Sequence, residues 1–146
     1  MFKKAFFSIG FLFLIFSADA QFRKIPAEVT DAFKAKYAEA SGVTWRDKLS
    51  SFQAEFKVGE KEMRSVFSSK GDWLRTETKF DYVSLPAEVK DGFKKSKYAD
   101  LSVLEVNRVE EADQINYKVI VKKSEFNKKF LVFSKTGQLM SDNGTF

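Results

Sequence analysis

Hydrophobic and polar residues alternate along much of the chain, most clearly between positions 52 and 58. Every second residue there is apolar and the residues between them are polar: Phe52, Ala54, Phe56 and Val58, separated by Gln53, Glu55 and Lys57. Successive side chains of a strand point to opposite faces, so this pattern predicts a strand with one buried face. Further strands are predicted over residues 43–47, 61–67, 73–79, 103–109, 115–122, 126–133 and 139–141.

A helical spacing precedes the first strand. Val29, Phe33 and Tyr37 follow one another at intervals of four, which places them on one face of a helix. Pro26 suits the start of that helix because the first turn lacks partners for its N–H groups. Glu28 then places a carboxylate near the positive end of the helix dipole. The pattern predicts a helix with Pro26 at its first position and an aromatic stripe on its buried face.

The same pattern recurs later in the chain. Ile-Pro-Ala-Glu-Val at 25–29 returns as Leu-Pro-Ala-Glu-Val at 85–89, sixty positions further on. Residues 67–74 correspond to 133–140, and in both segments a glycine follows a phenylalanine by four positions. The second interval is 66, so insertions of six residues in total fall between the two motifs. Motifs that recur in the same order are typical of repeated structural units. The sequence therefore predicts two diverged copies of one unit.

Each unit is expected to contain one helix followed by about four antiparallel strands. The predicted units are residues 21–82 and 83–146, and the fold class is α+β, with each helix packed on a roughly four-stranded antiparallel sheet. A unit of this size buries only a small core by itself. The connection at 81–84 is short and contains neither glycine nor proline. We therefore expect the halves to pack closely, and a shared continuous sheet is one way to do so.

Residues 1–20 have the pattern of a signal peptide. Lys3 and Lys4 precede an apolar run at 5–16, and Ala18 and Ala20 supply the small residues before the cleavage position. The run is shorter than the roughly 20 apolar residues that span a bilayer. The sequence predicts cleavage after Ala20, a periplasmic or secreted protein, and no membrane span after cleavage.

Composition excludes several kinds of chemistry. The chain has no cysteine and no histidine, so it has no thiol nucleophile, imidazole base, disulfide or ordinary zinc site. Its net charge of +5 comes from lysines and arginines that are mixed with acids along the chain. Nucleic-acid-binding proteins concentrate basic residues on one face, and we expect no such binding here. We expect no enzyme activity, no catalytic residues, no cofactor and no metal site.

The helix start at 25–29 and 85–89, together with the Phe-x-x-x-Gly hairpins, resembles the PepSY-like family. This family is similar in fold to the β-lactamase inhibitor protein, and its members are often small exported proteins of the Gram-negative envelope. The resemblance covers residues 25–140. The family hairpin commonly carries an acidic residue after the phenylalanine, whereas this chain has Ser68 and Ser134. Any role of that acid is therefore in doubt here.

The resemblance implies a non-enzymatic binding module that places a sheet face against a partner. The expected partner is another envelope protein, and inhibition of that protein or of a protease is the implied outcome. The alternative is binding of a small ligand or cation in the groove between the two repeats. An open sheet face rich in aromatic and arginine side chains favours the first, and a concave apolar pocket favours the second.

Five residues are candidates for protein binding. Tryptophan and arginine are enriched at interface hot spots, and these residues fall within the predicted strands or close to them. The candidates are Trp45, Arg46, Arg64, Trp73 and Arg75. Trp73 occupies the repeat position of Leu139, which favours a core position. Either tryptophan would be a natural anchor for a partner if it stood on the open face of the sheet.

Overall fold

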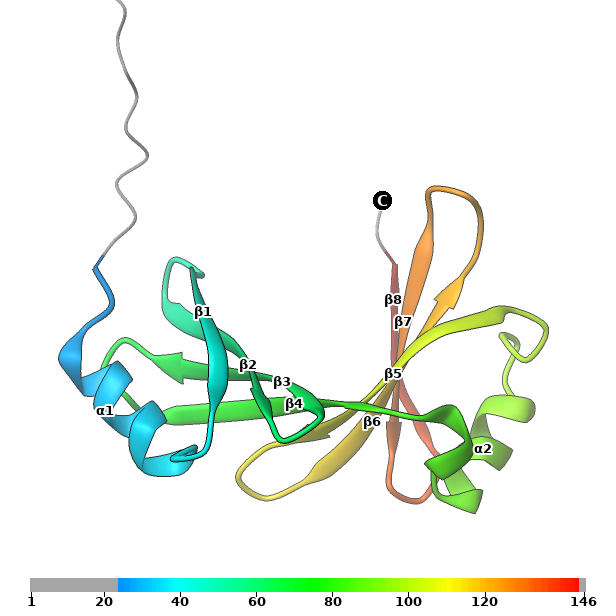
Figure 1. The fold of residues 1–146 in the computed structure, drawn as a ribbon. Coiled ribbons are helices and arrows are strands. Elements are labelled where there is room, and N and C mark those ends of the chain that lie inside the picture. Colours follow the sequence, from blue (N-terminus) through cyan, green and yellow to red (C-terminus); the bar gives the residue numbers. More distant parts are fainter. Residues whose placement is uncertain (1–23, 145–146) are drawn as a thin grey trace, which may run out of the picture.

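The fold is described by a computed structural model that covers residues 24–144. Within these residues the chain forms two α-helices, a short 3-10 helix and eight strands (Figure 1). The elements are α1 (Ala27–Lys36), β1 (Ser41–Asp47), β2 (Ser51–Val58), β3 (Lys61–Ser68), β4 (Trp73–Phe80), η1 (Tyr82–Ser84), α2 (Ala87–Lys94), β5 (Ser102–Glu110), β6 (Ile115–Lys122), β7 (Lys128–Ser134) and β8 (Leu139–Gly144). The predicted leader and its cleavage after Ala20 lie outside the described residues.

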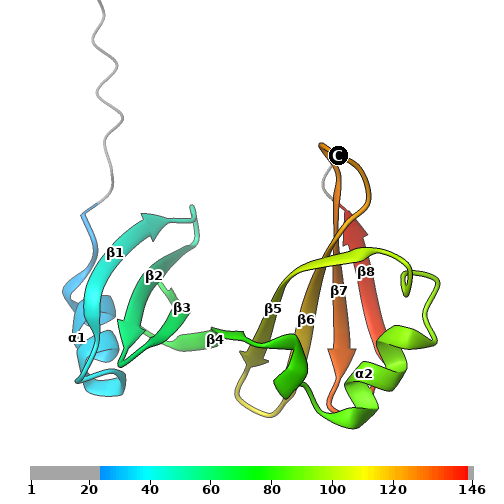
Figure 2. The same ribbon diagram turned by 45° about the vertical axis from the view of Figure 1, so that its right-hand side comes forward.

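The strands form one antiparallel sheet in sequence order from β1 to β8 (Figures 1 and 2). Strands β4 and β5 join its two halves, from Thr76 opposite Glu110 to Phe80 opposite Val106. The predicted α+β class is confirmed, but the strands do not form a four-stranded sheet for each unit: all eight belong to one continuous sheet, the shared arrangement that was left open. The physical reason is that β4 and β5 pair backbone groups that two separate sheets would leave unpaired at their edges.

Both helices cover the same face of this sheet. On β4, the Thr76 hydroxyl is hydrogen-bonded to Tyr37, which caps α1, whereas Phe80 packs against the cluster under α2. Residues 76 and 80 are separated by an even number of positions, so their side chains lie on one face of the strand. The opposite face of the sheet is therefore left without a helix.

The helices form where the sequence places their start signals. Pro26 and Pro86 are the N-cap residues, and each is followed by a glutamate in the first turn. Lysines lie in the last turn of each helix, where they complement the negative end of the dipole. Each helix buries a valine and a phenylalanine one turn apart. Burying each of these side chains is worth about 1.5–3 kcal/mol.

Two separate apolar clusters lie between the helices and the sheet. The buried residues of the first are Val29, Phe33, Phe52, Ala54, Phe56 and Phe67. Those of the second are Leu85, Val89, Phe93, Tyr98, Val106, Tyr117, Val119, Val121, Leu131 and Phe133. One sheet thus carries two cores, each beneath its own helix.

Two hairpin glycines contact the helices directly. Gly71, between β3 and β4, lies against the backbone of Glu28 in the first turn of α1. Gly137, between β7 and β8, lies in the same way against Glu88 of α2. The Phe-x-x-x-Gly motif therefore places a residue without a side chain where the hairpin meets the helix.

One difference from the predicted strands is at Phe126. The sequence predicts that β7 begins there, but the strand begins at Lys128. Phe126 lies in the turn between β6 and β7, and its side chain is 92% exposed. The strand alternation extends only to the residues that have cross-strand partners, from Lys128 opposite Lys122 onward.

Candidate functional site

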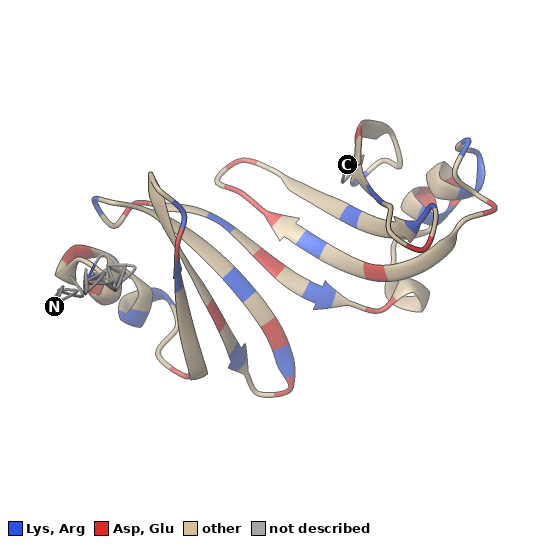
Figure 3. Cartoon of the chain, turned by 90° about the horizontal axis from the view of Figure 1, so that it is seen from above, with Lys and Arg blue, Asp and Glu red and all other residues tan. Residues whose placement is uncertain are grey.

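The uncovered face of the sheet carries a continuous row of polar side chains across strands β1 to β4. Thr44, Glu55, Arg64 and Glu77 are successive cross-strand partners in this row. Side chains that are directly opposite on neighbouring strands lie close enough to form ion pairs. Figure 3 shows basic and acidic positions side by side on these strands. Alternate residues of each strand are apolar and lie on the helix-covered face. The charged residues between them lie on the uncovered face.

Glu77 is the centre of this arrangement. Its side chain is only 12% exposed, and Lys118 of β6 donates to its Oε2 at 2.5 Å. Arg64 lies 3.8 Å from the same oxygen, and the Arg75 Nε lies 3.7 Å from Oε1. The Lys118 contact crosses from one half of the sheet to the other. Glu77 therefore forms ion pairs with three cations, which belong to strands β3, β4 and β6.

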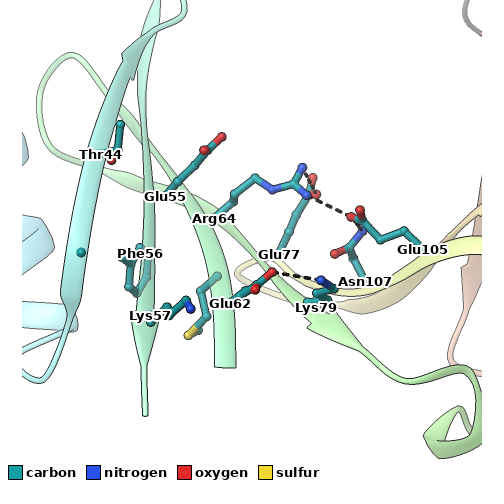
Figure 4. Close-up of a pocket in the computed structure, with 12 residues that line it drawn as sticks. Thr44, Glu55, Phe56, Lys57, Glu62, Arg64, Glu77, Lys79, Glu105 and Asn107 are labelled. Carbon is teal, nitrogen blue, oxygen red and sulfur yellow. Dashed lines mark hydrogen bonds and ion pairs between the residues drawn. The ribbon is translucent and has the colours of Figure 1, made fainter. Parts of the chain in front are cut away.

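Arg64 connects Glu77 to a second carboxylate. Its Nη2 donates to Glu105 Oε1 at 3.0 Å, and the amide of Asn107 donates to the same oxygen at 2.7 Å (Figure 4). Asn107 is itself buried. Because charge-assisted hydrogen bonds are stronger and more directional than neutral ones, these contacts fix the side chains of β3 and β5 relative to one another.

The periphery of the network is also paired. Arg46 approaches both carboxylate oxygens of Glu55, at 3.1 and 3.3 Å, and Lys79 bonds to Glu62 at 3.1 Å. Exposed ion pairs of this kind contribute little to stability, because water and salt screen them. The main effect of the network is therefore to fix the conformations of these surface side chains, and its contribution to the stability of the fold is small.

A hollow of about 390 Å³ lies on this part of the face. Residues of β1 to β5 line it, and Figure 4 shows Arg64, Glu77 and Glu105 on one side with Lys57 and Glu62 on the other. The lining is dominated by charged groups that are already bonded to one another. Such a surface can recognise a partner through ion pairs and hydrogen bonds.

The protonation of Glu62 reflects this pairing. The hydrogen bond and charge of Lys79 hold the pKa of Glu62 below its ordinary value of 4.5. A lowered pKa keeps the carboxylate ionised, whereas a general acid needs a raised one. Because the folded-state pKa is below the unfolded value, the pairing stabilises the fold at higher pH, and this contribution is lost as the pH falls through the folded pKa.

Lys79→Met is expected to raise the pKa of Glu62 towards 4.5. The change removes the hydrogen bond and the charge that lower it. NMR titration of the Glu62 side-chain carboxyl carbon measures this directly. Lys94→Met, on α2, is the control and is expected to leave the Glu62 titration unchanged. An unchanged Glu62 midpoint in Lys79→Met would show that the pair does not form in solution.

The structure brings the three predicted arginines together on the uncovered face. Arg64 and Arg75 flank Glu77, and Arg46 lies at the edge of the network beside Glu55. The residues that join them were not among the predicted candidates: Glu77, Lys118 and Glu105. The alternation of Arg75, Glu77 and Lys79 along β4 is the signal that could have identified the polar face.

The two tryptophans lie on the helix-covered face. Trp45 packs edge-on against Phe33 of α1, with the ring centroids 5.2 Å apart. The indole N–H of Trp73 donates to Thr76 at 2.8 Å, and the amine of Lys36 lies 3.9 Å from the Trp73 ring. Neither residue is part of the uncovered face. A role for them in protein binding stays a prediction.

Comparison with known families identifies the chain. The family described as "Putative beta-lactamase-inhibitor-like, PepSY-like" matches residues 50–141, which is more than half of the sequence. The chain belongs to this PepSY-like family. The resemblance expected from the helix starts and hairpins is thereby confirmed.

Solved structures of similar fold come from Bacteroides. A BLIP-like protein from Bacteroides fragilis is 25% identical with a TM-score of 0.74, and the alignment covers 87% of this chain and 91% of that one. A DUF2874 family protein from Bacteroides uniformis is also 25% identical, with a TM-score of 0.75 and coverage of 82% and 88%. A protein from Bacteroides eggerthii called "putative periplasmic" is 23% identical, with a TM-score of 0.76 and coverage of 83% and 89%.

No curated protein matches the sequence. Across residues 24–144, each helix is too short or too polar to cross a membrane.

Proposed function

We propose that this PepSY-like protein is a non-enzymatic binding module of the bacterial envelope. Its uncovered sheet face contacts another envelope protein, and inhibition of that protein is the form of binding that the family description suggests. The observation that carries the proposal is the ordered charge network centred on Glu77, on the face that both helices leave uncovered.

An ordered array of charges suits recognition of a folded protein. Side chains that are already held in place lose less conformational entropy when a partner binds. Complementary charge on the partner also raises the association rate and excludes wrong partners. The central side chains of the face are Arg46, Lys57, Arg64, Arg75, Lys79 and Lys118, with Glu55, Glu62, Glu77 and Glu105. Cations outnumber carboxylates, so the proposed partner surface has an excess of acidic groups.

The proposed location is the periplasm or the exterior. Residues 1–20 have the pattern of a signal peptide, with cleavage proposed after Ala20. The similar Bacteroides eggerthii protein is called "putative periplasmic", which is compatible with this location.

The proposal of two tandem copies, residues 21–82 and 83–146, is supported by the order of elements. A helix and four strands are followed by a second helix and four strands, each with its own apolar cluster. In this proposal, pairing of β4 with β5 extends the uncovered face across both copies.

The alternative function, small-ligand or cation binding in the groove between the halves, has less support. The hollow near the junction is lined by charged groups that bond to one another, whereas small-molecule sites are mostly apolar with a few converging polar groups. Among the residues that the structure describes, no three acidic side chains gather as metal ligands. We therefore favour the protein-binding function.

Arg64→Glu is expected to reduce retention of the partner at least tenfold in affinity purification from envelope extract, because charge reversal at the centre of a complementary interface costs several kcal/mol. Tagged mature protein serves as bait, and the bound proteins are quantified by mass spectrometry. Lys94→Glu on α2 is the matched charge reversal on the other side of the molecule and is expected to retain the partner. Retention in the wild type is expected to fall as salt is raised.

Circular dichroism of each variant establishes that it is folded before use. Equal retention by wild type and folded Arg64→Glu would remove the uncovered face as the binding surface. Absence of any specifically retained protein would count against the protein-binding function itself and turn attention to small ligands.

A further inference from the structure

The hairpin between β6 and β7 is a second surface with a distinct character. In Figures 1 and 2 it lies in the same half of the sheet as α2 and projects from the ends of β6 and β7 that point away from that helix. We define the basic hairpin as residues 122–129, Lys-Lys-Ser-Glu-Phe-Asn-Lys-Lys. The charge network on the uncovered face does not include these residues.

The basic hairpin combines concentrated positive charge with an exposed aromatic side chain. It holds four lysines and one glutamate, a net charge of +3 within eight residues. Phe126 is 92% exposed, the highest value among the exposed large hydrophobic residues of the described chain. Residues 122–128 are all exposed. The Phe126 side chain therefore adds nothing to the packing of the hydrophobic core.

Two of the lysines face one another across the hairpin. Lys122 lies directly opposite Lys128 across the two strands, and like charges in that position destabilise a sheet. Glu125 compensates in part through a contact of 2.6 Å with Lys122. The hairpin therefore concentrates positive charge that an anionic surface would attract.

We propose that the basic hairpin anchors the protein to an anionic phospholipid surface. Lysine amines reach the headgroups, and the Phe126 ring enters the boundary between headgroups and acyl chains. Two backbone N–H groups of the turn already have partners within the hairpin. Those of Lys123 and Ser124 donate to the Asn127 carbonyl oxygen at 2.9 and 3.1 Å. The uncovered face can then meet an envelope protein while the hairpin holds the molecule at the membrane.

A membrane fits this surface better than a folded acidic protein does. A stable protein interface takes about 800 Å² from each partner, which a single projecting turn does not provide. A bilayer needs only the tip of the turn, because the aromatic ring inserts and the charges act along the surface. The inference is independent of the proposed binding partner.

The test measures binding of the mature protein to lipid vesicles. The protein is purified from the periplasm of an expression host, and its mass establishes that the leader is absent. Co-sedimentation is compared between phosphatidylcholine vesicles with and without phosphatidylglycerol. Binding is expected only with phosphatidylglycerol. Lys123→Gln is expected to lower the partition coefficient about fivefold, and Phe126→Ala about tenfold.

Matched controls separate the hairpin from general charge and hydrophobicity. Lys135→Gln lies beyond the opposite end of β7, and Val83→Ala removes another exposed apolar side chain. Both are expected to bind like the wild type. Because the chain has no cysteine, Ser124→Cys gives a single position for an environment-sensitive dye, whose emission is expected to shift to the blue on anionic vesicles.

Three outcomes would overturn the proposal. The first is absence of phosphatidylglycerol-dependent binding at low salt. The second is equal losses in the hairpin variants and the controls. The third is binding of the same lysines to heparin or to acidic protein without any binding to vesicles, which would assign the hairpin to another polyanion.

Discussion

Phe33→Ala is expected to lower the free energy of unfolding by about 3–5 kcal/mol, the usual cost of truncating a fully packed aromatic residue. Phe33 is 5% exposed and lies at the centre of the first apolar cluster. Its ring contacts Phe56 and Trp45 edge-on, with centroids 4.9 and 5.2 Å apart. The substitution therefore removes the main contact of α1 with the sheet and leaves a cavity.

Urea unfolding followed by circular dichroism measures this loss. Phe126→Ala provides a matched control, since the same truncation on an exposed side chain is expected to change stability by less than about 0.5 kcal/mol. Similar losses in the two variants would contradict the assignment of Phe33 to the core.

Gly137→Ala is expected to cost about 3 kcal/mol for two additive reasons. Gly137 has a φ of +81°, and this left-handed conformation costs other residues about 1–2 kcal/mol. An added Cβ would also lie 2.0 Å from the Glu88 carbonyl oxygen, which belongs to the backbone of α2. Relieving this overlap requires the hairpin and the helix to separate, at a cost of about 1–3 kcal/mol.

Gly59→Ala is the control for the second of these reasons. Gly59 has a φ of +59°, but nothing lies within 4 Å of the position its Cβ would take. Its substitution is expected to cost only the conformational term, about 1–2 kcal/mol. Thermal unfolding of both variants separates the two terms. Equal shifts in melting temperature would show that the hairpin does not press against α2.

Much of the fold follows from local patterns in the sequence. The alternation at Phe52, Ala54 and Phe56 predicts both the strand and its buried face. This is possible because the side chains of one strand point alternately to the two faces of the sheet. The pairing of β4 with β5 could not be predicted in the same way. Alternation indicates which face of a strand is buried, but it does not indicate which strand lies at each edge.

The candidate site was predicted only in part, and the structure shows why. Trp45 and Arg46 are adjacent in one strand, so only one of them can point to the uncovered face. Trp73 and Arg75 are two positions apart, which would place them on one face of a regular strand. A register shift between β3 and β4 places Trp73 opposite Phe67 and Arg75 opposite Val66, on different faces. A bulge of this kind leaves no clear signal in a single sequence.

The central claim is that the uncovered face, and not the helix-covered face, binds an envelope protein. Site-specific photo-crosslinking in living cells tests it most directly. A photoreactive residue is placed at Lys57 or Arg75 on the uncovered face, and at Asp31 or Asp91 on the helices. The account predicts one discrete crosslinked partner from the first pair of positions and none from the second. Crosslinks from the helix positions alone, or from none of the four, would contradict it.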